Sequence, residues 1–415
     1  MKLKAPVNES YAANVVCLKD TFPLGGLDNL VGVRFLGYTA LIPKSYWPGL
    51  YVMFPPETQL SENFCRENNL YREPTLNANP KEQGYLEKNR RVKALKLRGN
   101  VSSCMILPLS CFDYLGVNSS EFKDGDTFDH IGDDKICEKY VIKSADGTPA
   151  GRTKMPKSRV DAKLFPLHVD SQQWFKHDKE YADKFCIITQ KIHGVSWRGA
   201  NILVNKKLTW KDKVAKKLGI HVPDQEYALI VGSRRVTKDP NNPDQNHFYK
   251  QDIWSMMLEE VKDAIPKDHI VYGELVGYTP DGGELQKNYT YDAKPGKMKL
   301  YVYRVAQINP DGDLVDYSWD GVKAFCNERG LEFTPELARC YGRDFNVDDY
   351  MNKRYYDEGF RQAIPLSHNK LPDEGICVRA EGIIPSIAKA KAPEFLVHES
   401  SDLDSGNIDI ESEQS

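Results

Sequence analysis

A lysine with the surroundings of a nucleophile stands at Lys191, directly after the apolar run Phe185 to Ile188 and three residues before Gly194. A lysine amine attacks phosphorus only after it loses its proton, which requires nearby cations, a metal ion or removal from water. The apolar run offers that removal from water, and Gly194 would allow the backbone to approach a phosphate group. The residue types therefore predict phosphoryl-group chemistry at Lys191.

The Lys-x-x-Gly pattern alone has little specificity, because it occurs four times, starting at Lys81, Lys96, Lys191 and Lys216. An isolated match is most often a solvated lysine before a turn glycine. Lys191 differs because it lies at the end of a strand-like apolar run and has four polar clusters after it in order. They are Ser233-Arg234-Arg235, Tyr272-Gly273-Glu274-Leu275-Val276-Gly277, Glu374-Gly375-Ile376 and Lys389-Ala390-Lys391.

The last cluster suits an anionic substrate. Attack on a nucleotide α-phosphate builds up charge that needs positive partners. Lys389 and Lys391 are two residues apart, so in a strand they point to the same face, while Ala388 and Ala390 suit close packing on the other face. An exposed basic edge strand is the alternative interpretation.

Glu274 and Glu374 are the candidate metal ligands. Glu274 lies within an otherwise apolar strand-like run, Ile270 to Val276. Acidic side chains are rarely buried unless they are paired or bind a metal ion, so a structural ion pair remains the alternative at this position. Divalent magnesium is commonly held by one or two carboxylates together with substrate phosphates.

Further residues complete the candidate site. Tyr303 is expected to stack on a purine, although core packing explains an aromatic strand equally well. Arg234 is expected to contact ribose or phosphate, with Arg235 as its rival. His193 is expected to have a structural or substrate-positioning role, and Trp197-Arg198 to border the site.

The elements that position these residues fall into two groups. The first part of the chain contains short β-like runs separated by turn residues, which predicts a small barrel or sandwich over 1–143. These runs are Val15 to Leu18, Val31 to Leu36, Tyr38 to Ile42, Leu50 to Phe54, Val92 to Leu97 and Val101 to Leu107. Residues 144–164 are rich in Gly, Pro, Lys and Arg, and are expected to form a basic linker.

From residue 165 to 398 the sequence mixes strand-like runs with helical ones, so an α+β domain with antiparallel sheets is predicted. Its expected strands are Phe185 to Thr189, Ile202 to Val204, Ala228 to Val231, Ile270 to Leu275 and Leu300 to Val305. The ranges Tyr249 to Ala264 and Gly321 to Arg329 have helical apolar spacing. The P-loop pattern Gly-x-x-x-x-Gly-Lys-Ser/Thr is missing from the sequence.

Charge is unevenly distributed along the 415 residues, whose net charge is −3 and whose pI is near 6.3. Basic blocks lie at Lys88 to Arg98 and at Arg152 to Lys163, and the first is expected to track a nucleic-acid backbone. The acidic segment 399–415 has little that could pack, and is expected to be a disordered tail.

The sequence also bears on the compartment. It contains no apolar stretch long enough for a membrane helix, and the start, Met1 to Pro6, lacks the apolar core of a secretion signal. Nine scattered cysteines show no zinc-ligand spacing. The expectation is an intracellular, by default cytoplasmic, protein with no membrane contact and no obligate protein partner.

As an ordered series, the clusters resemble motifs I, Ia, III, IV and V of the ATP-dependent RNA ligase family, and Leu300 to Val305 resembles motif IIIa. The tract Arg91 to Gly99 is similar to the N-terminal OB-like domain of one RNA ligase branch. Two departures stand out. Arg304 follows Tyr303 where an acid is common, and Val195-Ser196 replaces the frequent Thr-Asn.

The resemblance implies an ATP-grasp-like nucleotidyltransferase domain that follows a small β-barrel, OB-like, nucleic-acid-binding domain. It implies that Lys191 carries AMP from ATP, with Mg²⁺ or Mn²⁺, to the 5′-phosphate of a nicked duplex or broken RNA end, in RNA repair. It assigns nucleotide contacts to Gly194, Arg234, Glu274, Tyr303, Glu374, Lys389 and Lys391, and metal contacts to Glu274 and Glu374.

Three alternatives remain open. DNA ligases and mRNA guanylyltransferases share these motifs, but they generally place an OB domain after motif V, and the residues after Lys391 are too few and too acidic for one. A nucleic-acid-binding protein built on an inactive ligase fold is the third. Adduct formation with ATP or GTP distinguishes among them.

Overall fold

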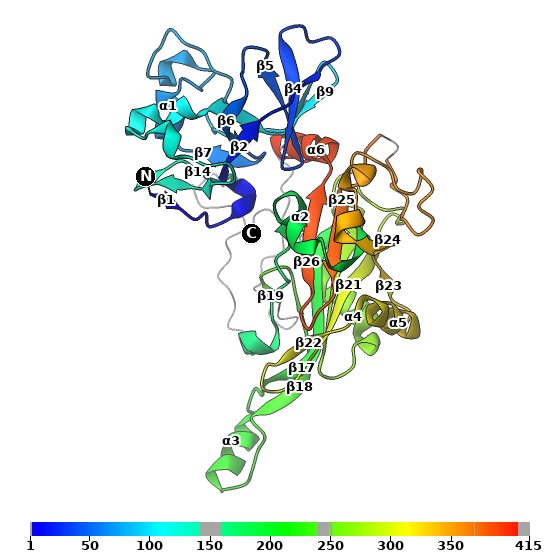
Figure 1. Cartoon of the computed structure of the whole chain (residues 1–415). Coiled ribbons are helices and arrows are strands. Elements are labelled where there is room, and N and C mark those ends of the chain that lie inside the picture. Colours follow the sequence, from blue (N-terminus) through cyan, green and yellow to red (C-terminus); the bar gives the residue numbers. More distant parts are fainter. Residues whose placement is uncertain (1, 142–158, 239–248, 250, 369, 406–415) are drawn as a thin grey trace. The chain divides into compact units, whose positions relative to one another are not determined.

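The computed structural model describes residues 2–141, 159–238, 249, 251–368 and 370–405 (Figure 1). These residues fall into two compact units. The N-terminal unit comprises 2–141 together with 391–405, and the central unit comprises 159–390. Each described helix is too short or too polar to cross a membrane.

The N-terminal unit is rich in β structure, as predicted. Its strands are β1 (Leu3–Lys4), β2 (Ala13–Leu18), β3 (Phe22–Pro23), β4 (Leu30–Phe35), β5 (Tyr38–Pro43), β6 (Gly49–Phe54), β7 (Thr58–Leu60), β8 (Leu95–Leu97), β9 (Asn100–Ser102), β10 (Met105–Pro108), β11 (Thr127–Phe128), β12 (His130–Ile131), β13 (Asp134–Lys135) and β14 (Cys137–Lys139). Its helices are α1 (Glu62–Glu67) and α6 (Pro393–Asp404). The largest sheet has the order β10-β6-β2-β11, with antiparallel pairing throughout.

Both faces of this sheet are buried. In β6, Val52 and Phe54 pack into one hydrophobic cluster, whereas the alternate residues Tyr51 and Met53 pack into another. Side chains alternate between the two faces of a strand, so a strand buried on both sides needs a continuous apolar run. This requirement explains the unbroken apolar sequence of β6.

The prediction of a disordered tail over residues 399–415 is wrong for its first part, because residues 399–404 form the end of helix α6. Leu396 of this helix is 5% exposed and belongs to the core of the N-terminal unit. Ser400 is also buried, and its hydroxyl accepts a hydrogen bond from the backbone N–H of Ala94 at 3.0 Å. Residues 406–415 of the expected tail lie outside the described residues.

Acidic residues of α6 form ion pairs with part of the basic block Lys88 to Arg98. Arg91 is 2% exposed, and it pairs with Asp404 and with Glu57, the latter at 3.0 Å. Lys93 pairs with Asp404 at 2.9 Å, and Lys96 pairs with Glu394 of the same helix at 3.2 Å. The expectation that Arg91 follows a nucleic-acid backbone is therefore wrong, since its guanidinium is committed to contacts within the unit.

Because the Glu57 carboxyl is buried, we expect the stability of the N-terminal unit to depend on pH. Burial raises the pKa of this carboxyl to about 7, although Arg91 and the Ser400 hydroxyl act in the opposite direction. The folded state then binds more protons than the unfolded state between pH ~4.5 and ~7, so the unfolding free energy falls as pH rises through this range, by roughly 3 kcal/mol.

Chemical unfolding at pH 5, 6, 7 and 8 measures this effect. The Glu57→Gln variant should lose most of the slope, because it has no proton to release. Glu121→Gln is the control, since Glu121 is exposed and should keep the wild-type slope. Identical slopes for wild type and Glu57→Gln would assign the pH dependence to other groups.

The central unit is an α+β structure of mainly antiparallel sheets, as predicted. Its strands are β15 (Gln172–Gln173), β16 (Phe185–Lys191), β17 (Val195–Asn205), β18 (Gln225–Gly232), β19 (Thr237–Lys238), β20 (His269–Gly277), β21 (Met298–Ile308), β22 (Leu314–Asp316), β23 (Glu332–Phe333), β24 (Glu336–Tyr341), β25 (Gly375–Ala380) and β26 (Ser386–Lys391). Its helices are α2 (Trp174–Tyr181), α3 (Trp210–Lys217), α4 (Ile253–Val261) and α5 (Trp319–Arg329).

Two sheets make up this unit. The first has the order β15-β26-β25-β16-β24, and the second has β19-β18-β17-β20-β21-β22, with β23 beside β21. In β16, Ile187 packs into the cluster that contains α4 and α5, while Cys186 and Ile188 pack into the cluster on the opposite face. Burial on both faces therefore accounts for the apolar run that precedes Lys191.

The predicted helices begin at capping residues. The range expected from Tyr249 starts as a helix only at Ile253, because the Asp252 side chain accepts a hydrogen bond from the backbone N–H of Ser255. Helix α5 starts two residues earlier than expected, at Trp319, because Ser318 caps it in the same way.

Two predicted domain boundaries are wrong. Leu164 and Phe165 are buried in the core of the central unit, and the backbone N–H of Asn205 donates to the carbonyl of Arg159 at 3.0 Å. The described end of the expected linker, 159–164, therefore belongs to this unit. At the other boundary, the chain from Lys391 onward groups with the N-terminal unit instead of ending a domain at residue 398. The rest of the expected linker and most of the basic block at Arg152 to Lys163 lie outside the described residues.

Candidate functional site

Lys191 lies where the chain passes from one sheet of the central unit to the other. It is the last residue of β16 in the five-stranded sheet, and Val195 is the first residue of β17 in the other sheet. Only residues 192–194 separate the two strands. This short connection places the Lys191 side chain at the junction of the sheets.

A cavity of about 140 Å³ lies at this junction. It brings together four of the predicted site residues: Lys191, Arg234, Glu274 and Tyr303. The other lining residues are His168, Val169, Ser171, Thr189, Gln190, Ile192, Ser196, Trp319, Thr334, Cys377, Arg379 and Ile387. Arg234, and not its rival Arg235, is the arginine that lines it.

Glu374 lies directly beside the candidate nucleophile. Lys191 Nζ is 3.0 Å from Glu374 Oε1, and His193 Nδ1 is 3.7 Å from Glu374 Oε2. Glu374 is 2% exposed, so this carboxylate is almost fully removed from water. A buried carboxylate at this distance holds the lysine side chain in one orientation.

Charged side chains from several of the predicted motifs affect the pKa of the Cys377 thiol. Burial raises the pKa of its thiol, the charges of Lys191 and Lys389 lower it, and those of Glu374 and Glu274 raise it. Two cations and two carboxylates from four separated motifs therefore act on one thiol. The structure thus gathers around Cys377 the residues that the sequence placed up to 198 positions apart.

Strand β26 has the alternation that was expected of the Lys-x-Lys cluster. Ala388 and Ala390 are both 0% exposed and pack into the core, while Lys389 and Lys391 occupy the other face. Lys391 Nζ lies 2.8 Å from Glu399 Oε1 of α6 and 5.2 Å above the Phe395 ring. The predicted contact of Lys391 with a nucleotide phosphate remains a prediction.

Gly194 is required by close packing within the protein. A Cβ atom at this position would lie 2.3 Å from the Leu275 carbonyl oxygen and 2.8 Å from Glu274 Cγ. The glycine therefore allows the connection after Lys191 to press against β20, which carries Glu274. The expected approach of Gly194 to a phosphate group is a separate claim that stays a prediction.

His193 has the structural surroundings that were expected. Its backbone N–H donates to the Tyr291 hydroxyl at 2.6 Å, and its ring packs edge-on against Tyr289 at 5.0 Å. Next to it, the Gln286 side chain donates to the Gly194 carbonyl at 2.9 Å. These contacts hold the three-residue connection in place.

Tyr303 is oriented by His168, a residue without any motif signal in the sequence. The Tyr303 hydroxyl lies 2.5 Å from His168 Nδ1. Burial, together with the charges of Arg198, Arg234 and Arg304, holds the pKa of His168 well below its usual range. The imidazole is therefore neutral at pH 7, and it fixes the tyrosine without adding charge to the cavity.

Arg198 supports the cavity from behind and does not line it. Its guanidinium donates to the backbone carbonyls of Ser233, Phe165 and Pro166 at 3.0, 2.7 and 3.0 Å. It therefore fastens the segments that lead to His168 and Arg234. The neighbouring Trp197 is 0% exposed in the core, so the expectation that Trp197-Arg198 borders the site is wrong.

Arg304, which replaces the acid common in the resembled motif, is a structural residue. It is 3% exposed, makes two hydrogen bonds to Asp316 at 2.5 and 2.9 Å, and lies 4.5 Å above the Tyr272 ring. The strand pairing shifts here, because Tyr272 is opposite Arg304 whereas Gly273 is opposite Val302. Tyr303 is therefore the extra residue of a β-bulge, and its side chain lines the cavity.

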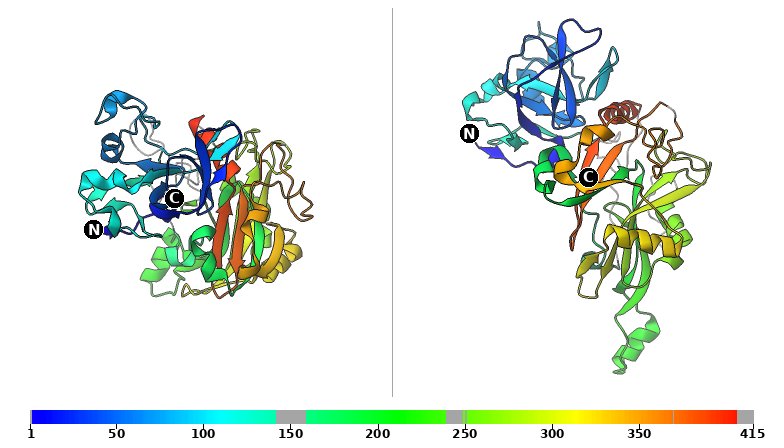
Figure 2. Two further views of the ribbon diagram at one scale, coloured as in Figure 1. Left: turned by 45° about the horizontal axis from the view of Figure 1, so that its top comes forward. Right: turned by 45° about the vertical axis from the view of Figure 1, so that its right-hand side comes forward.

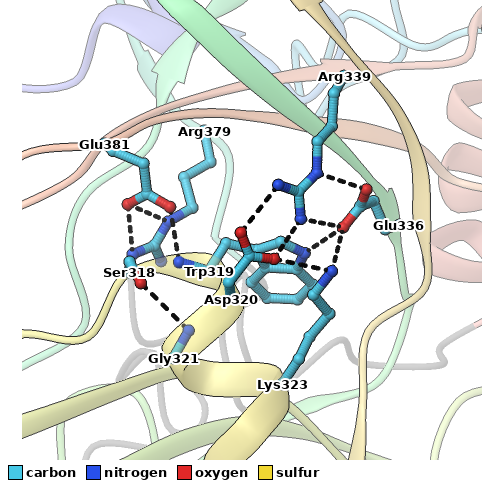
Figure 3. Close-up of polar contacts among 9 residues, drawn as sticks. All are labelled: Ser318, Trp319, Asp320, Gly321, Lys323, Glu336, Arg339, Arg379 and Glu381. Atoms are coloured by element: carbon cyan, nitrogen blue, oxygen red, sulfur yellow. Dashed lines mark hydrogen bonds and ion pairs between the residues drawn. The ribbon is translucent and has the colours of Figure 1, made fainter.

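An ion-pair network joins α5 to the first sheet beside the cavity (Figure 3). The Trp319 indole donates to Glu336 at 2.8 Å, and its backbone N–H donates to Glu381 at 2.6 Å. Arg339 bonds both Glu336 and Asp320. Hydrogen bonds from Arg339 hold the pKa of the Glu336 carboxyl at about 2, so this network stays ionised at neutral pH.

Some lining residues had a sequence signal and others had none. Cys377 and Arg379 belong to the same strand as the Glu374-Gly375-Ile376 cluster, at the spacing of two that places side chains on one face. His168, Trp319 and Thr334 come from segments without a motif. Their positions depend on how the sheets and α5 pack.

A family model described as RNA ligase matches residues 184–391. A search of curated protein sequences finds no match. Among solved structures, a mutant of Naegleria gruberi RNA ligase with ATP and Mn has a TM-score of 0.56 at 14% identity, covering 95% of this chain and 100% of that one.

Two further structures of the same N. gruberi protein are similar to this chain to the same degree. The RNA ligase with PPi has a TM-score of 0.57 at 14% identity, covering 95% of this chain and 100% of that one. Another mutant with ATP and Mn has a TM-score of 0.57 at 13% identity, covering 92% and 98%. At these identities the likeness establishes a shared fold over nearly the whole of both chains.

Proposed function

Because the chain belongs to the RNA ligase family, we propose that it joins RNA ends in an ATP-dependent reaction in which Lys191 carries AMP. The observation that carries the proposal is the position of Lys191 Nζ, in a cavity between two sheets and 3.0 Å from a buried carboxylate of Glu374. The use of ATP is supported by the fold shared with N. gruberi RNA ligase, which was solved with ATP and Mn.

The proposed reaction has three steps. The deprotonated Lys191 amine attacks the α-phosphorus of ATP, a nitrogen–phosphorus bond forms, and pyrophosphate leaves. An oxygen of an RNA 5′-phosphate then attacks the AMP phosphorus and displaces the lysine. Finally, the 3′-hydroxyl of the other end attacks the 5′-phosphorus, so that a phosphodiester forms and AMP leaves.

The side chains around the cavity have separate roles in this proposal. Glu374 orients the Lys191 amine, as the 3.0 Å contact indicates. Arg234 and Lys389 counter the charge on the phosphate oxygens, and Lys391 is proposed to join them. Tyr303, held by His168, presents its ring to the base.

A divalent metal ion fits the donor set. Among the described residues no group of three or more acidic, histidine or cysteine side chains could hold a metal alone. Glu274 and Glu374 are 8% and 2% exposed and act on the same thiol, which suits Mg²⁺ or Mn²⁺ shared with nucleotide phosphates and water. When bound, the metal would neutralise charge on the phosphates.

The first experiment identifies the nucleotide that reacts with the protein. Incubation with α-³²P-ATP and Mg²⁺ or Mn²⁺ should leave label on the denatured protein, and peptide mapping should place it on Lys191. Equal labelling by GTP would favour a guanylyltransferase, and absence of label from either nucleotide would favour an inactive nucleic-acid-binding protein. Nicked RNA duplexes, nicked DNA duplexes and single strands then distinguish RNA sealing from DNA sealing.

Tyr303 gives a further prediction. The Tyr303→Leu variant should raise the ATP concentration needed for half-maximal labelling by about tenfold, because base–aromatic stacking contributes roughly 1–3 kcal/mol. Tyr303→Phe is the matched variant, since it keeps the ring and loses the hydroxyl that bonds His168. If Phe and Leu variants are equally impaired, the hydrogen bond and not the ring is what the site needs.

The N-terminal unit is proposed to be an OB-like domain that contacts RNA. Its support is the set of small antiparallel sheets packed against two hydrophobic clusters and the fold shared with N. gruberi RNA ligase over both units. The natural substrate is proposed to be a nicked duplex or a broken RNA end.

A further inference from the structure

The hairpin formed by β17 and β18 carries a feature that the ligation chemistry does not use. The two strands pair from Arg198 with Gly232 out to Asn205 with Gln225, and helix α3 sits in the connection between them. Figure 1 and the right-hand view of Figure 2 show α3 beyond the other elements of the central unit. This tip is called the α3 tip below, and comprises residues 206–224.

The α3 tip is strongly basic, with six lysines against two aspartates. The two aspartates are already engaged, Asp212 with Lys206 at 3.3 Å and Asp224 with Lys216. The remaining lysines are exposed and have no ion pair with another residue of the described chain. They are Lys207, Lys211, Lys213 and Lys217.

Apolar side chains lie in a stripe along α3 and its C-cap residue, Leu218. Trp210, Val214 and Leu218 follow each other at intervals of four residues and are 72%, 46% and 72% exposed. Lys211 Nζ lies 5.9 Å from the Trp210 ring. An exposed tryptophan beside a lysine ammonium offers a stacking surface and positive charge together, which is how proteins commonly hold RNA.

The tip is preformed. Thr209 and Asp212 form a capping box, in which each side chain accepts a hydrogen bond from the backbone N–H of the other residue. The Lys206–Asp212 pair adds a tie to the preceding loop. The surface therefore exists without a partner, which lowers the entropic cost of binding one.

The tip lies far from Lys191. Strand β17 has 11 residues between the connection after Lys191 and the tip, which spans roughly 35 Å at about 3.3 Å per residue. That length corresponds to about ten base pairs at about 3.4 Å per nucleotide step. A nucleic acid held at the tip would be contacted well away from the ends being joined.

We propose that the α3 tip is a second RNA-binding site, which holds the RNA about ten base pairs from the joined ends. Lys207, Lys211, Lys213 and Lys217 contact backbone phosphates, and Trp210 stacks on an RNA base or packs on a ribose. The inference rests on the proposed ligase function for the identity of the polyanion. It adds a length requirement for the substrate, which the site at Lys191 does not impose.

The test compares two quadruple variants of the full chain. One replaces Lys207, Lys211, Lys213 and Lys217 with glutamate, and the matched control replaces the same four with arginine, which keeps the charge. Fluorescence anisotropy measures affinity for nicked RNA duplexes whose arms are 6 or 20 base pairs long, with each arm shortened separately.

The glutamate variant should bind the long-armed duplex at least about tenfold more weakly, with a salt dependence shallower by about three in slope. It should bind the short-armed duplex like the wild type. The arginine variant should match the wild type on both. Trp210→Ala should weaken binding to the long arm, and Trp210→Phe should retain most of it.

Labelling by ATP separates this inference from the proposed function. The glutamate variant should form the adduct at the wild-type rate, which also shows that it is folded. If the wild type forms no adduct but the glutamate variant still loses long-arm binding, the ligase proposal fails and the RNA site stands.

Two results would overturn the inference. One is equal affinity of the wild type and the glutamate variant for the duplex with both arms long. The other is loss of binding to phosphatidylserine vesicles by the glutamate variant with no loss of RNA binding, which would make the α3 tip a membrane contact.

Discussion

Replacing Lys191 with alanine should abolish the covalent AMP adduct, with labelling reduced at least about 1000-fold. The reason is chemical: alanine has no nucleophile, and the cavity positions the Lys191 amine against Glu374 for attack. The measurement is the amount of α-³²P label retained on the denatured protein after incubation with ATP and Mg²⁺. Sealing of nicked RNA should be lost with it.

The chain supplies its own control for this variant. Lys81 also begins a Lys-x-x-Gly sequence, and it is exposed in the N-terminal unit. Lys81→Ala should label like the wild type. Label on Lys191→Ala at the wild-type level would show that another residue carries AMP, and peptide mapping would identify it.

The three-step reaction allows a second check on the same variant. An RNA that already carries AMP on its 5′-phosphate bypasses the first two steps, which are the ones that need the lysine. Lys191→Ala should therefore still seal such an RNA. Failure to do so, in a variant with an unchanged unfolding temperature, would assign Lys191 a role in the last step as well.

Removing the charge of Glu374 should have the second largest effect. The Glu374→Gln variant should lower the rate of adduct formation about 100-fold or more. This carboxylate is 2% exposed, lies 3.0 Å from Lys191 Nζ, and is one of the two proposed metal contacts. Glutamine keeps its size but loses the charge that holds the amine and the metal.

Two comparisons give this prediction its meaning. Glu374→Asp keeps the charge and shortens the side chain, so partial activity would show that charge matters more than reach. Asp373→Asn changes the adjacent buried acid, which accepts hydrogen bonds from Gln190 and from the backbone of Tyr355. That variant should lower stability more than labelling. Wild-type labelling by Glu374→Gln would contradict the proposed role.

Much of the candidate site followed from local pattern. The apolar run before Lys191 forms a strand because both of its faces are buried, and the alternation of Ala388 and Ala390 with Lys389 gives β26 its two faces. Such periodicity depends on residues a few positions apart, so it can be recognised from the sequence alone. The order of the motif residues, which indicated nucleotide chemistry, is equally a property of the linear sequence.

Other residues could not be recognised in this way. His168 and Trp319 line the cavity, and Arg198 braces it, because segments far apart in the chain pack together. Nothing within ten residues of His168 marks it as a partner of Tyr303. The α3 tip was missed for a similar reason, since its lysines look like an ordinary solvated surface until the exposure of Trp210 is known.

The role of a charged segment also depends on its ion-pair partners in the folded chain. The block around Arg91 looked like a nucleic-acid surface, and the acidic residues after 399 looked like a disordered tail. In the folded chain Arg91 pairs with Asp404, which is 313 positions away. Neither segment carries a local signal of the other, because an ion pair of this separation depends on the packing of α6 and not on sequence neighbours.

Lys191 therefore owes its identification to sequence order and its surroundings to tertiary structure. Residue types and order singled it out from three other Lys-x-x-Gly lysines, since it ends a strand-like apolar run and also has Glu274, Glu374 and Lys389 downstream in order. Packing of the two sheets decided the rest. It buried Glu374 beside the amine and set Gly194 against β20, contacts that no periodicity encodes.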